Sequence, residues 1–373
     1  MRHTSNELYA DVVETLSVTL APSGRPLAAF ANGTIAFTSK VSGVPDLLVT
    51  LTGPSGKHHL RGLVELPVFH PCVRLARWRE QPGVLSFVPP DGRFTLAGYE
   101  VDLMPFTAEA AGMLGGGSPL KLPVAVEIKT GLGPTGSDFE VRLQVSRVFG
   151  SAGGASQSGR GGGLIGGGSG GGGAARGFGV GVPQPGTPAS PALQDLTVSV
   201  PLPADVRNLS EIRPTRGDAN YNPGDRALEW SISNKELAQG TASFALRCTV
   251  VGQLAEEDED QDPTGFGFGT GASAYSYDET YQSSSPVSKP AKKAVDAGGG
   301  AGDRDERRAA QNKMLMPSSA AVSFAVKGWL ASGIKVESIQ LDSRKSRGLG
   351  ENVKPYKGVK YLTVSKGGVE IRC

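Results

Sequence analysis

Residues 242–251, ASFALRCTVV, decide the fold class of this chain. Apolar residues occupy every second position, which is typical of a β-strand with one buried face. Further runs of the same kind occur along the chain, separated by turn signals such as Pro22-Ser23-Gly24, Pro90-Asp91-Gly92 and Asn222-Pro223-Gly224. Patterns of helical period are nearly absent. These runs alternate or are rich in β-branched residues: 34–42 (TIAFTSKVS), 124–129 (VAVEIK), 140–148 (EVRLQVSRV), 196–202 (LTVSVPL), 321–326 (AVSFAV) and 335–341 (KVESIQL). The sequence predicts an all-β protein, an elongated and mostly antiparallel β-sandwich.

Two segments depart from this pattern and are predicted to be long disordered loops. The first spans residues 151–190, and its first part, 151–186, contains 17 glycines. The second spans residues 255–312, opening with the acidic run AEEDEDQD and continuing through Gly/Ser-rich and Lys/Asp-rich sequence. Such compositions bury too little apolar surface to offset the entropy of ordering the backbone.

Charge and composition exclude several classes of protein. The 38 Lys and Arg residues nearly cancel 36 Asp and Glu residues, so a nucleic-acid partner held by phosphate neutralisation is not expected. No apolar run reaches the roughly 18–20 residues of a membrane span, and the N-terminal residues do not form a signal peptide. Three scattered cysteines predict free thiols in a reducing compartment rather than a disulfide framework or a zinc site.

Catalytic and cofactor motifs are missing from the sequence. The four histidines do not combine with acidic residues at a spacing typical of metal sites, and no serine lies in a nucleophile elbow. Residues 53–57 (GPSGK) lack the four-residue spacer of a phosphate-binding loop. We therefore expect no enzyme activity, no cofactor and no metal.

Four segments in fixed order resemble the mu homology domain, the cargo-binding half of the medium subunits of adaptor protein complexes. They are residues 6–14 (NELYADVVE), 42–47 (SGVPDL), 86–94 (SFVPPDGRF) and 357–361 (KGVKY). The stretch FHPCVR at 69–74, together with Trp78 and the closing KGVKY, is most similar to the medium subunit of adaptor protein complex 3. The resemblance covers residues 1–373 apart from the two low-complexity segments.

The resemblance implies a banana-shaped β-sandwich in two subdomains. Subdomain A would combine residues 1–104 with 330–373, and subdomain B, residues 105–329, would be inserted between them. Members of the family begin with a longin-type domain that docks into the adaptor core. Here the mu homology domain starts almost at Met1, so the sequence is expected to be either a fragment or truncated gene product, or a protein without the assembly half.

The resemblance also implies a site for Tyr-x-x-hydrophobic sorting signals, which bind as an added strand at a sheet edge. Tyr9 would stack on the signal tyrosine, and Asp11 would accept a hydrogen bond from its phenol. Lys360 stands where clathrin-linked members carry arginine, and Thr38 stands where they carry lysine. Counting only Asp11 and Lys360 as charged, the sequence predicts that phosphorylation of the signal tyrosine abolishes binding.

A second pocket, for the hydrophobic signal residue, is predicted on the other face of the first strand. Strand alternation places Leu8 and Ala10 together on that face. The resemblance adds three residues from the C-terminal part of the chain, so that the predicted pocket consists of Leu8, Ala10, Val336, Ile339 and Val359.

The expected function is that of a cargo-recognition subunit of a vesicle-coat adaptor, acting in transport from the Golgi or endosome to the lysosome or vacuole. Its partners would be the cytosolic tails of membrane cargo proteins and the other subunits of a heterotetrameric adaptor complex. The protein would be cytoplasmic and peripheral on Golgi and endosomal membranes and on transport vesicles. Two alternatives stay open: a truncated β-sandwich scaffold without cargo binding, and a monomeric endocytic mu-homology adaptor.

Overall fold

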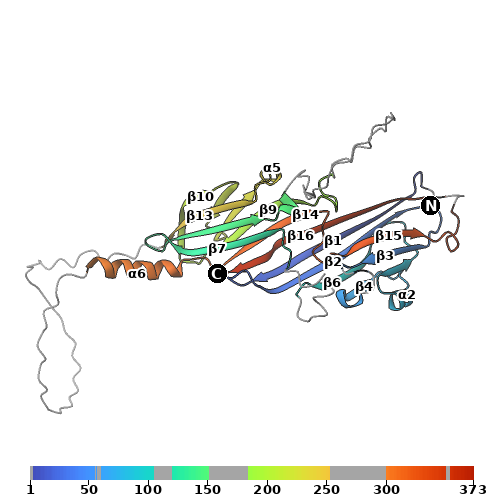
Figure 1. Cartoon of the computed structure of the whole chain (residues 1–373), viewed down its shortest axis with the longest axis horizontal. Helices are drawn as coiled ribbons and strands as arrows, with labels where there is room; N and C mark the ends of the chain where they lie inside the picture. Colours follow the sequence, from blue (N-terminus) through green and yellow to red (C-terminus); the bar gives the residue numbers. More distant parts are fainter. Residues whose placement is uncertain are drawn as a thin grey trace, which may run out of the picture.

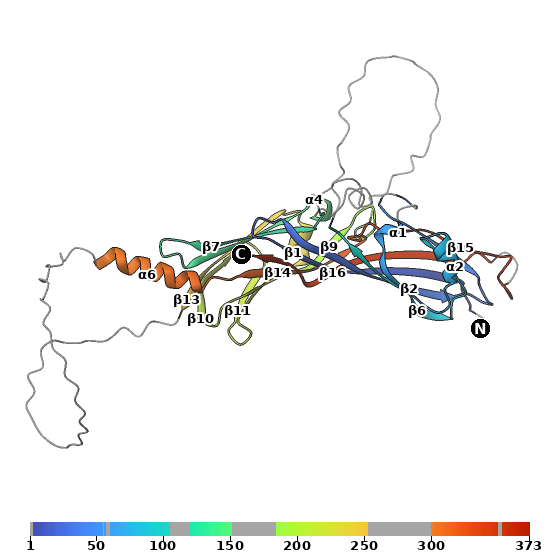
Figure 2. The same ribbon diagram turned by 90° about the horizontal axis from the view of Figure 1, so that it is seen from below.

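Strands dominate the computed structural model of the chain, which describes residues 3–54, 56, 60–104, 120–150, 184–252, 300–349 and 353–373. They form one long sheet and two smaller sheets, one toward each end of an elongated molecule (Figures 1 and 2). This confirms the predicted all-β fold class.

The long sheet has nine strands in the order β11-β12-β9-β14-β16-β1-β2-β6-β4. The strands are β1 (Glu7–Leu20), β2 (Pro26–Lys40), β4 (Glu65–Phe69), β6 (Gly92–Asp102), β9 (Ala192–Pro201), β11 (Asp218–Asn222), β12 (Ala227–Ile232), β14 (Ser319–Lys327) and β16 (Tyr356–Arg372). Among the strand pairs described, only β1 and β16 run in parallel. The first and the last strand of the chain are therefore neighbours at the centre of the long sheet.

The two smaller sheets cover the apolar face of the long one. The four-stranded sheet has the order β10-β13-β8-β7, and the three-stranded sheet has the order β15-β3-β5. Their strands are β3 (Leu47–Thr52), β5 (Val84–Phe87), β7 (Val124–Leu132), β8 (Asp138–Val145), β10 (Val206–Pro214), β13 (Ser243–Gly252) and β15 (Lys335–Leu341). In β1, every even-numbered residue from Leu8 to Leu20 is buried, so one face of this strand is covered along its whole length.

Helices in the described part of the chain are short, with one exception. They are α1 (Leu60–Leu63), α2 (Leu75–Glu80), α4 (Arg147–Gly150), α5 (Asn234–Ala238) and α6 (Gly300–Met314). The α5 helix begins with a capping box, in which the side chains of Ser233 and Glu236 each accept a hydrogen bond from the backbone of the other residue. Figure 1 shows α6 extending away from the four-stranded sheet.

The predicted boundaries of the two loops are too wide at their C-terminal ends. Residues 184–190 form turns closed by a bridge between Thr187 and Ser190. Residues 300–312 belong to α6, whose polar sequence lacks the apolar periodicity that predicts a helix. The remaining parts of both predicted loops, residues 151–183 and 255–299, lie outside the described residues.

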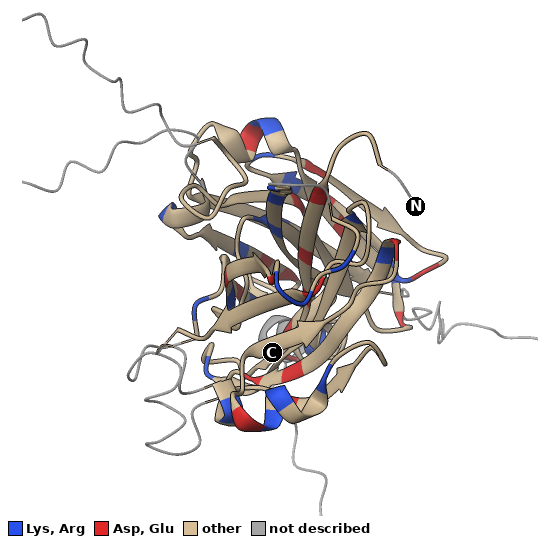
Figure 3. Cartoon of the chain, turned by 90° about the vertical axis from the view of Figure 1, so that its right-hand side faces the viewer, with Lys and Arg blue, Asp and Glu red and all other residues tan. Residues whose placement is uncertain are grey.

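The proposed subdomain boundaries stay a prediction, but the strands on either side of them share one sheet. The β1, β2, β6 and β16 strands of proposed subdomain A are continuous with β9, β11, β12 and β14 of subdomain B. Figure 3 shows acidic and basic residues interspersed over the strands, as expected from a net charge of +2.

Candidate functional site

The first five residues of β16, 356–360, form a free sheet edge. On one side, Tyr356–Tyr361 pair with Glu7–Val12 of β1. On the other side, pairing with β14 begins only at Leu362, opposite Lys327. Within the described residues, no strand pairs with the N-terminal part of β16 on that second side.

Backbone groups of Lys357 and Val359 point to this free edge. In a strand, the N–H and C=O groups of alternate residues point to opposite neighbours. The N–H of Tyr356 donates to Asn6 beside β1, whereas the carbonyl of Tyr361 accepts from Gly328 on the other side. The same alternation directs Lys357 and Val359 away from β1, so that they offer two N–H and C=O pairs to an incoming strand.

The four residues predicted for the tyrosine pocket lie together on the outer face of the long sheet, beside this edge. Tyr9 pairs with Thr38 on β2, and Asp11 pairs with Lys360 on β16. Partner residues on paired strands point to the same face. Partial burial, followed by the nearby carboxylate of Glu7, raises the pKa of the Tyr9 hydroxyl.

Two further residues lie on this face beside the four predicted ones, and sequence reasoning missed them. The first is Tyr356, an exposed residue whose ring centroid lies 5.8 Å from that of Tyr9. The second is Arg93 on β6, whose Nη1 atom forms an ion pair with Oδ2 of Asp11 at 3.1 Å. Arg93 directly follows the Pro90-Asp91-Gly92 turn, but its contact with Asp11 spans two neighbouring strands and leaves no local signal in the sequence.

The inner face beside the edge is apolar. Leu8 and Ala10 are fully buried, and Val359, the partner of Ala10, is half-buried. Of the predicted hydrophobic pocket, these three residues share a face by register. Leu8 and Ala10 are core residues, and only Val359 of the three is partly exposed.

The other two predicted pocket residues, Val336 and Ile339, lie on β15 in the three-stranded sheet. A register shift between Val336 and Ser338 brings both side chains to the side of Leu51 and Val49, which is buried. The Val336 N–H donates to the hydroxyl of Tyr361 at 2.9 Å, which ties the start of β15 to β16. Val336 and Val359 therefore supply the half-exposed apolar surface next to the free edge.

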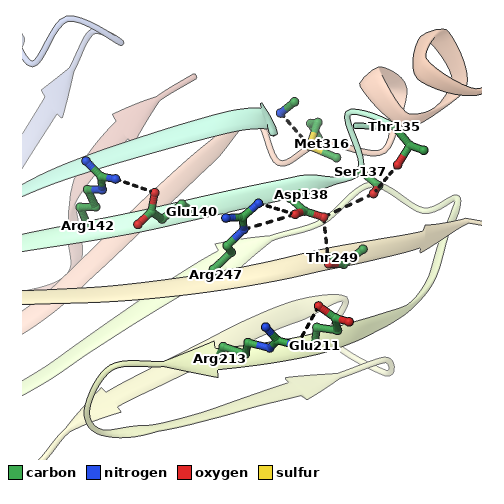
Figure 4. A network of polar contacts seen from close by, with 11 residues as sticks. Thr135, Ser137, Asp138, Glu140, Arg142, Glu211, Arg213, Arg247, Thr249 and Met316 are labelled. Atoms are coloured by element: carbon green, nitrogen blue, oxygen red, sulfur yellow. Dashed lines mark hydrogen bonds and ion pairs between the residues drawn. The ribbon is translucent and has the colours of Figure 1, made fainter. Parts of the chain in front are cut away.

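A second polar surface lies on the outer face of the four-stranded sheet (Figure 4). Arg247 holds Asp138 at 2.7 Å, and Arg142 holds Glu140 at 2.8 Å. Burial alone would raise the pKa of Asp138, but hydrogen bonds from Arg247 and Thr249 lower it. Each of these arginines has an acidic partner, so this surface consists of compensated ion pairs.

Neither a metal centre nor a membrane-spanning helix occurs among the described residues. They contain no group of three or more His, Cys, Asp or Glu side chains able to hold a metal ion. In the same part of the chain, no helix has the length and apolar character needed to cross a membrane. All three cysteines are free thiols, and burial raises the pKa of Cys248 to about 12.

Comparison with known proteins identifies the family. The whole chain, residues 1–373, matches the adaptor complexes medium subunit family, and the chain belongs to this family. Membership confirms the resemblance drawn from the sequence, including the prediction of a non-enzymatic adaptor protein.

Several relatives are subunits of AP-3 complexes. The chain is 26% identical over 234 residues to the AP-3 complex subunit mu-2 of Rattus norvegicus, covering 62% of this chain and 41% of the rat protein. It is 41% identical over 101 residues to the AP-3 complex subunit mu-1 of Homo sapiens, covering 27% of this chain and 22% of the human protein. The chain thus spans about two fifths of the length of the mu-2 relative.

Structural comparison agrees on the fold. A homology model of the full-length AP-3 complex in an intermediate open conformation matches with a TM-score of 0.53 and 18% identity. The match covers 100% of this chain and 69% of that chain. Sequence family and fold together place this protein among the medium subunits of vesicle adaptor complexes.

Proposed function

We propose that this chain is the cargo-recognition part of an adaptor medium subunit and binds Tyr-x-x-hydrophobic signals in the cytosolic tails of membrane proteins. The observation that carries the proposal is the free edge of β16 at Lys357 and Val359. Tyr9 and Asp11 lie beside this edge on the outer face of the sheet, and an apolar surface lies beside it on the inner face. An extended peptide added here gains backbone hydrogen bonds and contacts with both faces.

The spacing of the signal agrees with the two faces of the sheet. Residues i and i+3 of an extended peptide point to opposite sides. With the signal tyrosine on the outer face near Tyr9 and Asp11, the hydrophobic residue points to the inner face, near Val336 and Val359. The phenol hydroxyl can then donate to the carboxylate of Asp11.

The relatives suggest where such a subunit works. Because relatives of this chain are named as subunits of AP-3 complexes, its partners would be the other subunits of a heterotetrameric adaptor. The protein would be peripheral on Golgi or endosomal membranes and on vesicles bound for the lysosome or vacuole. The alternative is a scaffold without cargo binding, and titration with a Tyr-x-x-Leu tail peptide distinguishes the two.

The substitution Lys357→Pro tests the edge directly. Proline removes the N–H group that faces the free edge, and it is tolerated in strands where that group is not needed for pairing. Lys357→Ala is the matched control, because it removes the same exposed side chain and keeps the N–H. We expect Lys357→Pro to weaken binding of a Tyr-x-x-Leu tail peptide about tenfold, while Lys357→Ala retains most of the affinity.

Peptide variants provide the second arm of the measurement. Calorimetric titration with Ala in place of the signal tyrosine, or of the leucine, should show no binding. If the folded wild-type chain does not bind the Tyr-x-x-Leu peptide, the chain is a scaffold and the proposed function is wrong.

A further inference from the structure

Arg93 reaches the site from a strand that does not border it. On the outer face, Tyr9 of β1, Thr38 of β2 and Arg93 of β6 form one row across three strands. Two neighbouring strand spacings, about 10 Å in all, separate β6 from β1. The Arg93 side chain crosses this distance diagonally to Asp11.

Short residues leave the path open for this arginine. The positions between Arg93 and Asp11 on β2 are Thr38 and Ala36, both with small side chains. By the family resemblance, clathrin-linked members carry lysine at the position of Thr38. In this chain Asp11 has Lys360 beside it on β16, and a second positive charge comes from Arg93 on β6, as a planar guanidinium rather than an ammonium group.

The ion pair leaves half of the Asp11 carboxylate available. Arg93 contacts Oδ2, and the side chain of Asp11 keeps 22% of its surface exposed. The 63% exposure of the Arg93 side chain means that the pair contributes little to folding stability. The pair lies on the same face as Tyr9, which is two residues from Asp11 on β1, and only the Oδ2 atom of Asp11 is in the contact with Arg93.

We propose that Arg93 is a positioning residue that makes binding depend on the hydroxyl group of the signal tyrosine. Arg93 holds one oxygen of Asp11, so the other oxygen is fixed as the acceptor for the phenol. A phenylalanine signal leaves this acceptor unpaired and is rejected. The inference rests on the proposed function of the edge, and what it adds is the role of Arg93 on β6.

The test compares two tail peptides that differ only in Tyr or Phe at the signal position. For the wild-type chain we expect the Tyr peptide to bind at least about tenfold more tightly than the Phe peptide. In Arg93→Ala, the Tyr peptide should lose about fivefold in affinity while the Phe peptide changes by less than about twofold. Arg93→Lys should retain part of the discrimination, because a lysine keeps the charge but not the planar fork.

Two further variants separate positioning from a general loss of charge or of fold. Arg213→Ala is the matched control, since Arg213 forms a similar exposed pair with Glu211 at 3.2 Å on β10. Arg213→Ala should change the affinity for neither the Tyr peptide nor the Phe peptide. In an Asp11→Asn background, Arg93→Ala should have less than about a twofold effect on the Tyr peptide, because Arg93 acts through Asp11.

The outcomes distinguish the inference from the function on which it rests. If wild type binds the Tyr peptide and Arg93→Ala leaves the Tyr-to-Phe ratio unchanged, the role of Arg93 is wrong and the proposed function stands. If wild type binds neither peptide, both are wrong. Equal losses of both peptides in Arg93→Ala, with the thermal unfolding midpoint unchanged, would also overturn the selection for the hydroxyl.

Discussion

Gly358 shapes the outer side of the candidate site because a side chain at this position would collide with Tyr9. A Cβ atom added at Gly358 would lie 2.6 Å from Cδ1 of Tyr9. The ring of Tyr9 lies against the backbone of β16 at this position. The aromatic surface next to the edge is therefore formed by Tyr9 and Tyr356.

Arg93 also changes the expected response to a phosphorylated signal tyrosine. Sequence reasoning counted one cation, Lys360, and predicted complete loss of binding, but the structure adds a second cation in contact with Asp11. A phosphate group repels Asp11 and attracts both cations. We now expect phosphorylation to weaken binding about tenfold, or ~1.4 kcal/mol, rather than to abolish it.

Titration of one tail peptide in both forms measures this difference. Arg93→Ala should weaken the phosphorylated peptide by more than the about fivefold loss expected for the unphosphorylated one, because only Lys360 then attracts the phosphate charge. A phosphopeptide that binds more tightly than the unmodified peptide would show that Asp11 does not face the signal tyrosine.

At the level of elements, the bulge in β15 decides which residues reach the second pocket. Regular alternation would place Val336 and Ile339 on opposite faces. The extra residue, Glu337, restores them to one face. A bulge depends on how the partner strand pairs, so the period of the sequence alone could not predict this arrangement.

A buried carboxylate attaches the loop between β14 and β15 to β1. Glu14 is fully buried and accepts hydrogen bonds from the Tyr99 hydroxyl at 2.9 Å and the Ser332 N–H at 3.0 Å, as well as from the Ser332 hydroxyl. The Tyr99 ring reaches Glu14 across Gly33, where a Cβ atom would lie 2.1 Å from the ring. The network joins β1, β6 and the segment leading into β15.

The pH dependence of stability tests this network. Burial, the largest effect, raises the pKa of Glu14 above the usual 4.5, although hydrogen bonds from Ser332 and Tyr99 oppose the shift. A raised pKa means that the folded state favours the protonated form. The contribution of Glu14 is then complete below pH 4.5 and is lost as the pH rises through the pKa of the folded state.

We therefore expect wild type to lose stability relative to Glu14→Gln as the pH rises above 4.5, by ~1.4 kcal/mol for each unit of pKa shift. Urea unfolding at stepped pH values measures the difference. If the unfolding free energy of wild type instead rises relative to that of Glu14→Gln as the pH increases, the hydrogen bonds outweigh burial.

At the scale of the molecule, sequence patterns predicted where strands lie but not which strands pair or which side chains meet. The run at 124–129 begins with β7 at Val124, and the run at 242–251 corresponds to β13, Ser243–Gly252. Both have alternating residues, and a strand needs only one buried face to produce that alternation. The parallel pairing of β1 with β16 and the contact of Arg93 with Asp11 join residues far apart in sequence, so no local pattern contained them.

Contacts between distant residues also decide how the second predicted loop, residues 255–312, ends. Its C-terminal part, residues 300–312, belongs to α6. Leu315 and Met316 follow α6 and are buried, and Leu315 lies against Gly252 at the end of β13. The Asn312 side chain donates to the carbonyl of Thr135 at 2.8 Å. The end of α6 is thus part of the folded body, whereas composition alone assigned it to a disordered segment.

Deletion of the low-complexity segments tests this division. We expect replacement of residues 151–183 and 253–299 by Gly-Ser linkers of about ten residues to shift the unfolding midpoint by no more than about 4 °C. The reason is that loop closure costs only ~0.6 kcal/mol per doubling of loop length. Extending the second deletion to residue 312 should lower the midpoint further, because it removes the bond from Asn312 to Thr135 and the helix that leads into Leu315. Calorimetric scans of the two deletion variants give the comparison, and an equal midpoint for both would show that α6 contributes nothing to the fold.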